Sequence, residues 1–186
     1  MRLNFIFLHF MLHNLIIFLY TVIRGDVMFT YIKKHWVGLL VSIIIAELVG
    51  FMAGLLSGNT RMFYQQLNQP PLAPPGWLFG VVWPILYAFM GIAAYIVYDK
   101  GKDHEKDTAL SLYNIQLIVN FMWSIVFFRF QLPWVSVLVI LLLDVLVVLT
   151  ILAFNKIDQK AAWFLYPYLA WILFATYLNI GIAILN

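Results

Sequence analysis

Cysteine is absent from the 186 residues, and charged side chains make up only 10% of them. This absence excludes disulfide bonds, thiolate metal sites and a cysteine nucleophile. The four histidines, at positions 9, 13, 35 and 104, lie outside the interior of the well-formed apolar segments. A buried imidazole for haem ligation or general base catalysis is therefore not expected. The sequence also lacks a cluster of metal ligands, a glycine-rich phosphate loop and a basic stripe for nucleic acid, so no catalytic or metal site is predicted.

Hydrophobic residues, by contrast, make up 65% of the chain, and its mean hydropathy is +0.95. A soluble domain averages roughly 45–50% apolar and about 25% charged residues. The chain is therefore predicted to be an integral membrane protein, with the lipid bilayer as its first partner. Its net charge of +3 does not indicate a nucleic-acid partner, because the basic residues lie between hydrophobic segments.

A transmembrane helix needs about 20 consecutive, mainly apolar residues. Five segments have this length, at 36–56, 77–98, 110–130, 133–154 and 163–185. The short connections predict one all-α domain over residues 28–186, a bundle of five transmembrane helices. The charged run at 99–107 is expected to form a solvated turn between the second and third helices. No two segments look like an internal repeat, so an inverted-repeat transporter is not predicted.

A sixth apolar segment, at 3–23, is interrupted by Asn4, His9, His13 and Asn14. It could be an extra helix, a signal sequence or an artefact of start-site choice, although no small-residue cleavage pattern follows it. Met28 opens the run MFTYIKKHW just ahead of the first good segment. We favour Met28 as the functional start, which makes residues 1–27 a doubtful extension. The two histidines alone do not predict a metal site.

Basic residues alternate between the two ends of the predicted bundle. One end has Lys33, Lys34, Lys100, Lys102, Lys106, Lys156 and Lys160. The opposite end has only Arg61 and Arg129. Because short cytoplasmic loops are enriched in Lys and Arg, the N-terminus of the five-helix core is predicted to be cytoplasmic and its C-terminus outside, in a cell membrane. The loop at 57–76 then faces outward.

This loop is rich in proline and leads directly into the second helix. Its prolines are Pro70, Pro71, Pro74 and Pro75, and the helix that follows contains Trp77, Trp83 and Tyr87. Proline fixes φ and removes a hydrogen-bond donor, so the loop is expected to be stiff. Two interpretations fit: a lid over a ligand pocket, or a structural entry into a membrane helix.

Polar and aromatic residues recur at helical spacing in three of the segments. They are Trp83, Tyr87 and Gly91 in the second, Tyr113, Gln116, Asn120, Trp123 and Phe127 in the third, and Tyr168, Trp171, Ala175 and Leu178 in the fifth, with Asn179 beside the last stripe. Such stripes face the inside of a membrane bundle. They could be interhelical packing, where amides contribute about 1 kcal/mol. They could equally line a cavity for a large, flat, apolar ligand with a few polar edges.

Two acids, Glu47 and Asp144, lie inside predicted helices without an evident basic partner. Ionisable residues at membrane depth are functional candidates, and this pair leaves proton-coupled transport open. In the first segment, Gly50 and Gly54 form a G-x-x-x-G pattern, which indicates close helix contact.

Three runs, PPLAPPGWLFGVVWPILYAFMG at 70–91, LYNIQLIVNFMWSIVFF at 112–128 and LYPYLAWILFATYLN at 165–179, resemble the translocator protein family. Its members are called TspO in bacteria and the peripheral-type benzodiazepine receptor in mitochondria, and this chain looks like a bacterial member. The resemblance covers residues 36–179. It implies a five-helix bundle, often a homodimer, which binds tetrapyrroles such as protoporphyrin IX and haem, and in some members sterols, benzodiazepines or isoquinoline carboxamides. It implies no required cofactor beyond such a ligand.

The resemblance also implies which residues contact the ligand. Trp83 and Asn120 look like polar contacts, Trp171 and Ala175 like the opposite wall, Tyr64 and Pro74 like lid contacts, and Tyr87 and Trp123 like further lining. Together with Gln116 and Phe127 from the stripe of the third segment, these residues make up the predicted ligand site.

Two departures from the family pattern limit what it implies. Relatives commonly have Trp-Tyr where this chain has Phe63-Tyr64, and often Trp where Leu72 stands. Some members are described as degrading protoporphyrin in light through tryptophans, so that activity is less expected here. The sterol motif lacks its basic residue after Tyr177, and sterol binding is not predicted. The ranking is a tetrapyrrole receptor in tetrapyrrole handling or stress response, then a light-dependent porphyrin-degrading enzyme, then a proton-coupled transporter.

Overall fold

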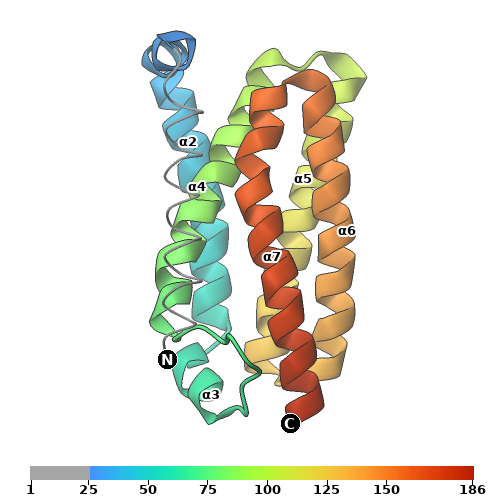
Figure 1. The fold of residues 1–186 in the computed structure, drawn as a ribbon. Helices are drawn as coiled ribbons and strands as arrows, with labels where there is room; N and C mark the ends of the chain where they lie inside the picture. The colour runs from blue at the N-terminus through green and yellow to red at the C-terminus, as the bar shows by residue number, and fades with distance from the viewer. Residues whose placement is uncertain (1–25) are drawn as a thin grey trace.

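The computed structural model describes residues 26–186, which form an all-α bundle (Figure 1). Five helices in this range are long and apolar enough to cross a membrane, so the predicted five-helix fold is confirmed. The predicted segment at 3–23, with His9 and His13, lies outside the described residues. The choice of Met28 as the functional start stays a prediction.

The long helices are joined by short turns, with one exception at the proline-rich segment. The elements are α2 Asp26–Leu56, α3 Thr60–Gln66, α4 Trp77–Lys100, α5 Asp103–Ser124 with the π-helical turn η1 Ile125–Arg129, α6 Pro133–Ile157 and α7 Gln159–Leu185. α2 begins ahead of the predicted first segment, and its backbone departs from helical geometry at His35. The predicted loop at 57–76 therefore contains one short helix, α3.

The prediction of a solvated turn over residues 99–107 is wrong in extent. Only Gly101 and Lys102 lie between α4 and α5. Asp103 and Glu105 occupy the first turn of α5, where carboxylates interact favourably with the helix dipole. Asp158 alone separates α6 from α7, and its side chain caps α7 by accepting a hydrogen bond from the Lys160 N–H at 2.8 Å.

Helix α4 is the centre of the bundle and α2 lies on its outside. In the most apolar window of α4, 56% of the residues are buried, against 17% in α2. The two helices touch closely at Gly91, because a Cβ there would lie 2.6 Å from the Ile43 Cα. Gly50 lies against the ring of Tyr87, whereas a Cβ at Gly54 would meet nothing within 4 Å. The G-x-x-x-G pattern therefore provides one helix contact instead of two.

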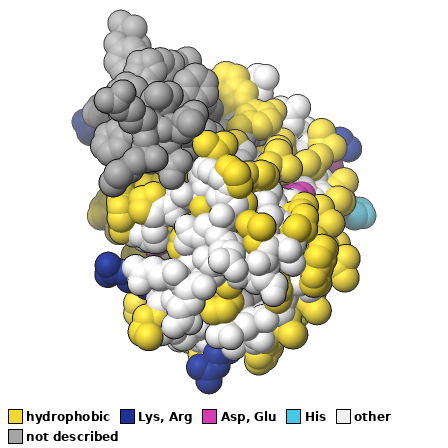
Figure 2. All heavy atoms as spheres, turned by 60° about the horizontal axis from the view of Figure 1, so that its bottom comes forward, with side chains coloured by type: hydrophobic (Ala, Val, Ile, Leu, Met, Phe, Trp, Pro, Cys, Tyr) yellow, Lys and Arg dark blue, Asp and Glu magenta, His cyan; other side chains and the backbone are white. Residues whose placement is uncertain are grey.

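The two ends of the bundle differ in charge. At the end with the α4–α5 and α6–α7 turns, Lys100 pairs with Asp158, and Asp99 accepts a hydrogen bond from Tyr31 at 2.8 Å. The other end, at the bottom of Figure 1, contains α3, the proline-rich segment and the C-terminal end of α7. Figure 2 turns this end, called the lid end below, toward the viewer: its visible surface is mainly hydrophobic or uncharged, with a few Lys or Arg side chains at the edge.

Candidate ligand-binding site

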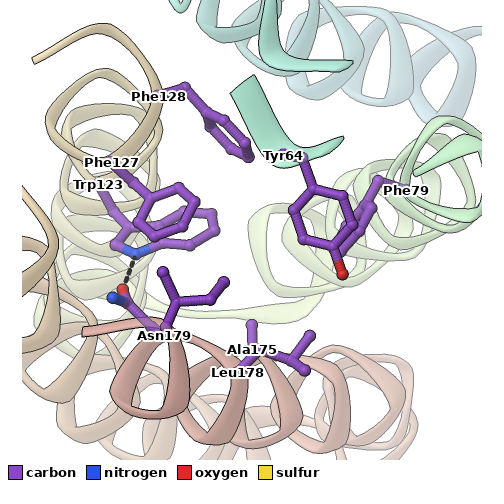
Figure 3. Close-up of a pocket in the computed structure, with 9 residues that line it drawn as sticks. Tyr64, Phe79, Trp123, Phe127, Phe128, Ala175, Leu178 and Asn179 are labelled. Atoms are coloured by element: carbon purple, nitrogen blue, oxygen red, sulfur yellow. Dashed lines mark hydrogen bonds between the residues drawn. The ribbon is translucent and has the colours of Figure 1, made fainter. Parts of the chain in front are cut away.

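At the lid end, a cleft opens between α3, α4, the α5–η1 segment and α7 (Figure 3). Its cavity volume is about 20 Å³, and it is lined by Tyr64, Phe79, Trp123, Phe127, Phe128, Ala175, Leu178, Asn179 and Ile182. Only the Tyr64 hydroxyl, the Trp123 N–H and the Asn179 amide bring polar atoms to an otherwise apolar wall. The lining therefore has the chemistry of a site for an apolar molecule, and the cleft would have to open to admit one larger than water.

The wall on the α5 side is a stack of aromatic rings. The rings of Trp123 and Phe127 are stacked at 5.8 Å, and Phe128 meets Phe127 edge-on at 4.8 Å. The π turn beginning at Ile125 adds one residue to the helical turn, so that adjacent residues 127 and 128 both face the cleft. Single π turns occur frequently at functional sites.

Asn179 fixes the position of the Trp123 indole. Its Oδ1 accepts a hydrogen bond from the Trp123 Nε1 at 2.9 Å, and its Nδ2 donates to the Ser136 Oγ at 2.9 Å and to the Pro133 carbonyl at 3.2 Å. The Asn179 side chain is only 1% exposed. One amide thus joins α5, α6 and α7 and holds the indole edge in a defined orientation.

Tyr64 of α3 covers the cleft from the lid side. Its hydroxyl donates to the Pro74 carbonyl at 3.0 Å, and its ring meets Phe79 edge-on at 5.2 Å. Burial raises the pKa of Tyr64 to about 12, so the hydroxyl remains a donor at neutral pH. The Asn59 side chain caps α3 by accepting from the Met62 N–H at 3.1 Å.

The proline-rich segment is attached to α7 at several points. Tyr177 donates to the Pro71 carbonyl at 2.7 Å, and Pro70 packs so closely on Gly181 that a Cβ there would lie 2.6 Å from the proline Cβ. Asn68 and Asn186 exchange hydrogen bonds at 2.9 and 3.1 Å. The segment is therefore held on α7 by hydrogen bonds at exposed positions between residues far apart in sequence. Together with α3 it is called the lid below.

The ten residues predicted from the sequence divide into two groups. Tyr64, Trp123, Phe127 and Ala175 line the cleft, and Pro74 contacts it through the Tyr64 hydrogen bond. The other five do not line the cleft: Trp83 and Trp171 contact lining residues from behind, and Tyr87, Gln116 and Asn120 lie deeper in the bundle, connected to Trp83 through Tyr87 and Tyr168. The Trp83 ring lies 6.3 Å from the Trp123 ring, and Trp171 lies 5.7 Å from Phe79.

The residues behind the lining form their own hydrogen bonds. Asn120 donates to the Tyr87 hydroxyl at 3.4 Å, and Tyr168 donates to the Gln116 Oε1 at 2.9 Å. The N–H of Trp171 is different, because it is buried and has no hydrogen-bond partner among residues 30–186. A buried donor without a protein partner is available to a ligand or a water molecule.

Five lining residues are absent from the predicted ligand site, namely Phe79, Phe128, Leu178, Asn179 and Ile182. The sequence does place Leu178 and Asn179 in or beside the inward stripe of the fifth segment. Phe79 could have been found, because it precedes Trp83 by four residues and so extends that stripe. Ile182 extends the α7 stripe from Leu178 in the same way. Helical spacing does not predict Phe128, because this residue faces the cleft only through the π turn.

The two acids within the helices lie outside the cleft lining. The Asp144 Oδ2 accepts a hydrogen bond from the Thr176 hydroxyl at 2.9 Å, and its Oδ1 is buried without a partner among the described residues. Glu47 is half-buried on α2. Within the same described part of the chain, no group of three or more His, Asp or Glu could hold a metal ion.

Five membrane-length helices around an aromatic cleft, closed by a proline-rich lid, define a multi-pass membrane protein with a site for a small apolar molecule. The sequence profile of the TspO/MBR family matches residues 40–185, and the chain belongs to this family. Its membership assigns a membrane ligand-binding or translocator role.

The alignments of this chain with named relatives cover most of its length. A tryptophan-rich protein TspO of Archaeoglobus fulgidus is 37% identical over 149 residues, which are 80% of this chain and 96% of the relative. A tryptophan-rich protein TspO of Chlorobaculum tepidum is 40% identical over 140 residues, 74% of this chain and 89% of the relative. The translocator protein of Bos taurus is 34% identical over 148 residues, 77% and 87% of the two chains.

Proposed function

We propose that this protein is a membrane receptor for tetrapyrroles such as protoporphyrin IX or haem, acting in tetrapyrrole handling or stress response. The observation that carries the proposal is the aromatic cleft under the lid, with the unpartnered Trp171 N–H behind it. The stacked faces of Trp123 and Phe127 suit a flat π-system. The proposed contacts are Tyr64, Pro74, Trp83, Tyr87, Gln116, Asn120, Trp123, Phe127, Trp171 and Ala175. No resident cofactor is required.

The cleft must enlarge to take such a ligand. Small-molecule pockets measure roughly 300–1,000 Å³, whereas the cavity volume of this cleft is about 20 Å³, which is room for about one water molecule. The contacts of the lid with α7 include the Asn68–Asn186 pair and the Tyr177 hydroxyl, all at exposed positions. If these contacts broke, the lid could move without disturbing the helices, as lids commonly do during ligand entry. Ligand binding should therefore order a different lid position.

Filling the cleft tests the proposal directly. In Ala175→Phe a ring occupies the space between α7 and the α5 wall, whereas in Ala170→Phe the same ring lies on the exposed face of α7. Quenching of tryptophan fluorescence by protoporphyrin IX, measured in the dark, should be saturable in the native protein and in Ala170→Phe. It should weaken at least about tenfold in Ala175→Phe. Equal quenching in all three proteins, or none, would remove the tetrapyrrole proposal.

A second candidate function is light-dependent degradation of bound protoporphyrin. The observation that favours it is the pair of indoles, Trp83 and Trp123, 6.3 Å apart at and behind the cleft wall. The same titrated sample under illumination distinguishes enzyme from receptor. A new absorption band that requires Trp123 and oxygen would indicate the enzyme, and bleaching at the rate of free porphyrin would indicate the receptor.

A third candidate, proton-coupled transport, is favoured by the buried, unpartnered Oδ1 of Asp144. It predicts pH-dependent uptake into liposomes that is lost in Asp144→Asn or Glu47→Gln.

We also propose that the protein is a homodimer in a cell membrane, with the N-terminus of its core cytoplasmic and its C-terminus outside. The wide apolar face of α2, little of which is buried within one chain, supports such an association.

A further inference from the structure

We propose that Arg61 and Arg129 form a cationic rim that binds the carboxylates of the molecule in the cleft. The ligand class is then an amphiphile with a flat apolar body and one or more acidic groups at its edge. This inference rests on the proposed function, because it assigns a place to the ligand's acidic groups beside the same cleft.

Both arginines belong to the elements that form the mouth of the cleft. Arg129 ends η1 and directly follows Phe128, which lines the cleft. Its guanidinium extends over the start of the lid segment, since a Cβ at Gly58 would lie 3.5 Å from the Arg129 Nη1. Arg61 lies one helical turn before Tyr64 on α3, and α3 packs against η1. Each cation therefore lies on an element that borders the cleft, and these two elements touch each other.

No acidic side chain neutralises these cations within the described part of the chain. The sequence contains no Asp or Glu between Leu48 and Tyr98, between Thr108 and Leu143, or after Asp158. The ion pairs of the described residues, His35–Asp99 and Lys100–Asp158, both lie at the opposite end of the bundle. Among the described residues, the lid end thus presents two guanidinium groups that form no ion pair with an acidic side chain, on elements that border an apolar cleft.

An apolar cleft with arginines on the elements that border it favours a ligand with an apolar body and acidic groups at one edge. The apolar cleft cannot take a carboxylate, because burying an unpaired charge is strongly unfavourable. A guanidinium at the rim can bind one through two parallel N–H···O bonds while the apolar body stays between the rings. The apolar wall thus fixes the body of the ligand, and the rim fixes which edge of it points outward.

A pair of ligands that differ only in charge tests the rim. Protoporphyrin IX and its neutral dimethyl ester are titrated in nanodiscs of zwitterionic lipid, against the native protein, Arg61→Gln, Arg129→Gln and the double variant. Lys156→Gln is the matched control, because it removes one exposed positive charge at the opposite end. Each rim variant should bind the free acid about three- to tenfold more weakly and the ester as before. The control should bind both ligands like the native protein.

The outcomes separate this inference from the proposed function. If the native protein binds acid and ester equally, or if the double variant keeps its preference for the acid, the rim does not bind carboxylates. If the rim variants weaken acid and ester alike, the arginines act on the fold, or on lipid phosphates, and the inference fails. In each case binding that still depends on Ala175 preserves the proposed function. If neither porphyrin binds the native protein, the proposed function itself fails.

Discussion

Asn179 is the residue on which the geometry of the cleft most depends. Its amide is fully hydrogen-bonded to Trp123, Ser136 and Pro133 from two neighbouring helices. In Asn179→Ala the buried Trp123 N–H and the Ser136 hydroxyl both lose a partner. An unsatisfied buried group costs about 1–3 kcal/mol. Side-chain hydrogen bonds between membrane helices contribute on average only about 0.6 kcal/mol. We expect a free-energy loss between these values, together with a red-shifted tryptophan emission.

Thermal unfolding in detergent and the emission spectrum measure the two effects of Asn179→Ala. Asn155→Ala is the control, because Asn155 is exposed on α6 and its replacement should change neither. An Asn179→Ala protein with native stability and native emission would show that packing alone positions the Trp123 ring.

The difference between Phe127 and Phe128 shows how far sequence periodicity reaches at the residue scale. Phe127 was predicted because it continues the spacing of Gln116, Asn120 and Trp123 along an α-helix. Phe128 lines the same cleft only because the helix changes to a π turn at Ile125. The segment IVFFR contains no glycine or proline to announce this change, and tertiary packing decides it. Asn179 was noted beside its stripe, but its hydrogen bonds depend on Pro133 and Ser136, which lie far away in sequence.

At the scale of elements, the sequence predicted the long helices well and their junctions poorly. Length and hydropathy suffice for α4 and α6, whose predicted starts at residues 77 and 133 agree with the structure. The charged run at 99–107 misled the prediction, because its residues continue two helices instead of separating them. Polar residues favour water over lipid, but they do not by themselves end a helix.

The contact between α2 and α4 depends on the missing side chain of Gly91. A Cβ at this position would lie 2.6 Å from the Ile43 Cα and 2.9 Å from the Ser42 carbonyl oxygen, and backbone atoms cannot move aside as a side chain would. Gly91→Ala should therefore separate the helices, break the hydrogen bond from the Ser42 hydroxyl to the Gly91 carbonyl and cost about 1–3 kcal/mol. The change is measured as a lower midpoint of thermal unfolding.

Gly80→Ala is the matched control on the same helix. A Cβ at Gly80 would meet nothing within 4 Å, and alanine favours a helix over glycine by up to about 1 kcal/mol. This variant should be as stable as the native protein or slightly more so. Equal destabilisation by both variants would mean that α4 is sensitive to any added side chain and that the close approach at Gly91 is not special.

For the molecule as a whole, the sequence was sufficient to predict the fold and the family, but not the shape of the cleft. Five apolar segments and three ordered motifs were sufficient for the first two. The placement of the ten predicted site residues in two layers, one lining the cleft and one behind it, depends on how α4, α5 and α7 pack. Periodicity assigns a residue to an inward face, but the depth at which it lies follows from its neighbours on other helices. The inward-facing stripes of Asn120 and Trp171 are therefore compatible with both packing and ligand contact.

The orientation of the bundle decides from which side a ligand reaches the lid, and the absence of cysteine makes it directly measurable. Gln65→Cys places a single thiol on an exposed residue of α3, and Lys102→Cys places one in the turn between α4 and α5, at the opposite end. With the lysine-rich end in the cytoplasm, a membrane-impermeant maleimide should label Gln65→Cys in intact cells and Lys102→Cys only after permeabilisation. The native protein controls for labelling without a thiol. The reverse pattern would place the lid and its two arginines in the cytoplasm, so that an acidic amphiphile would reach the cleft from inside the cell.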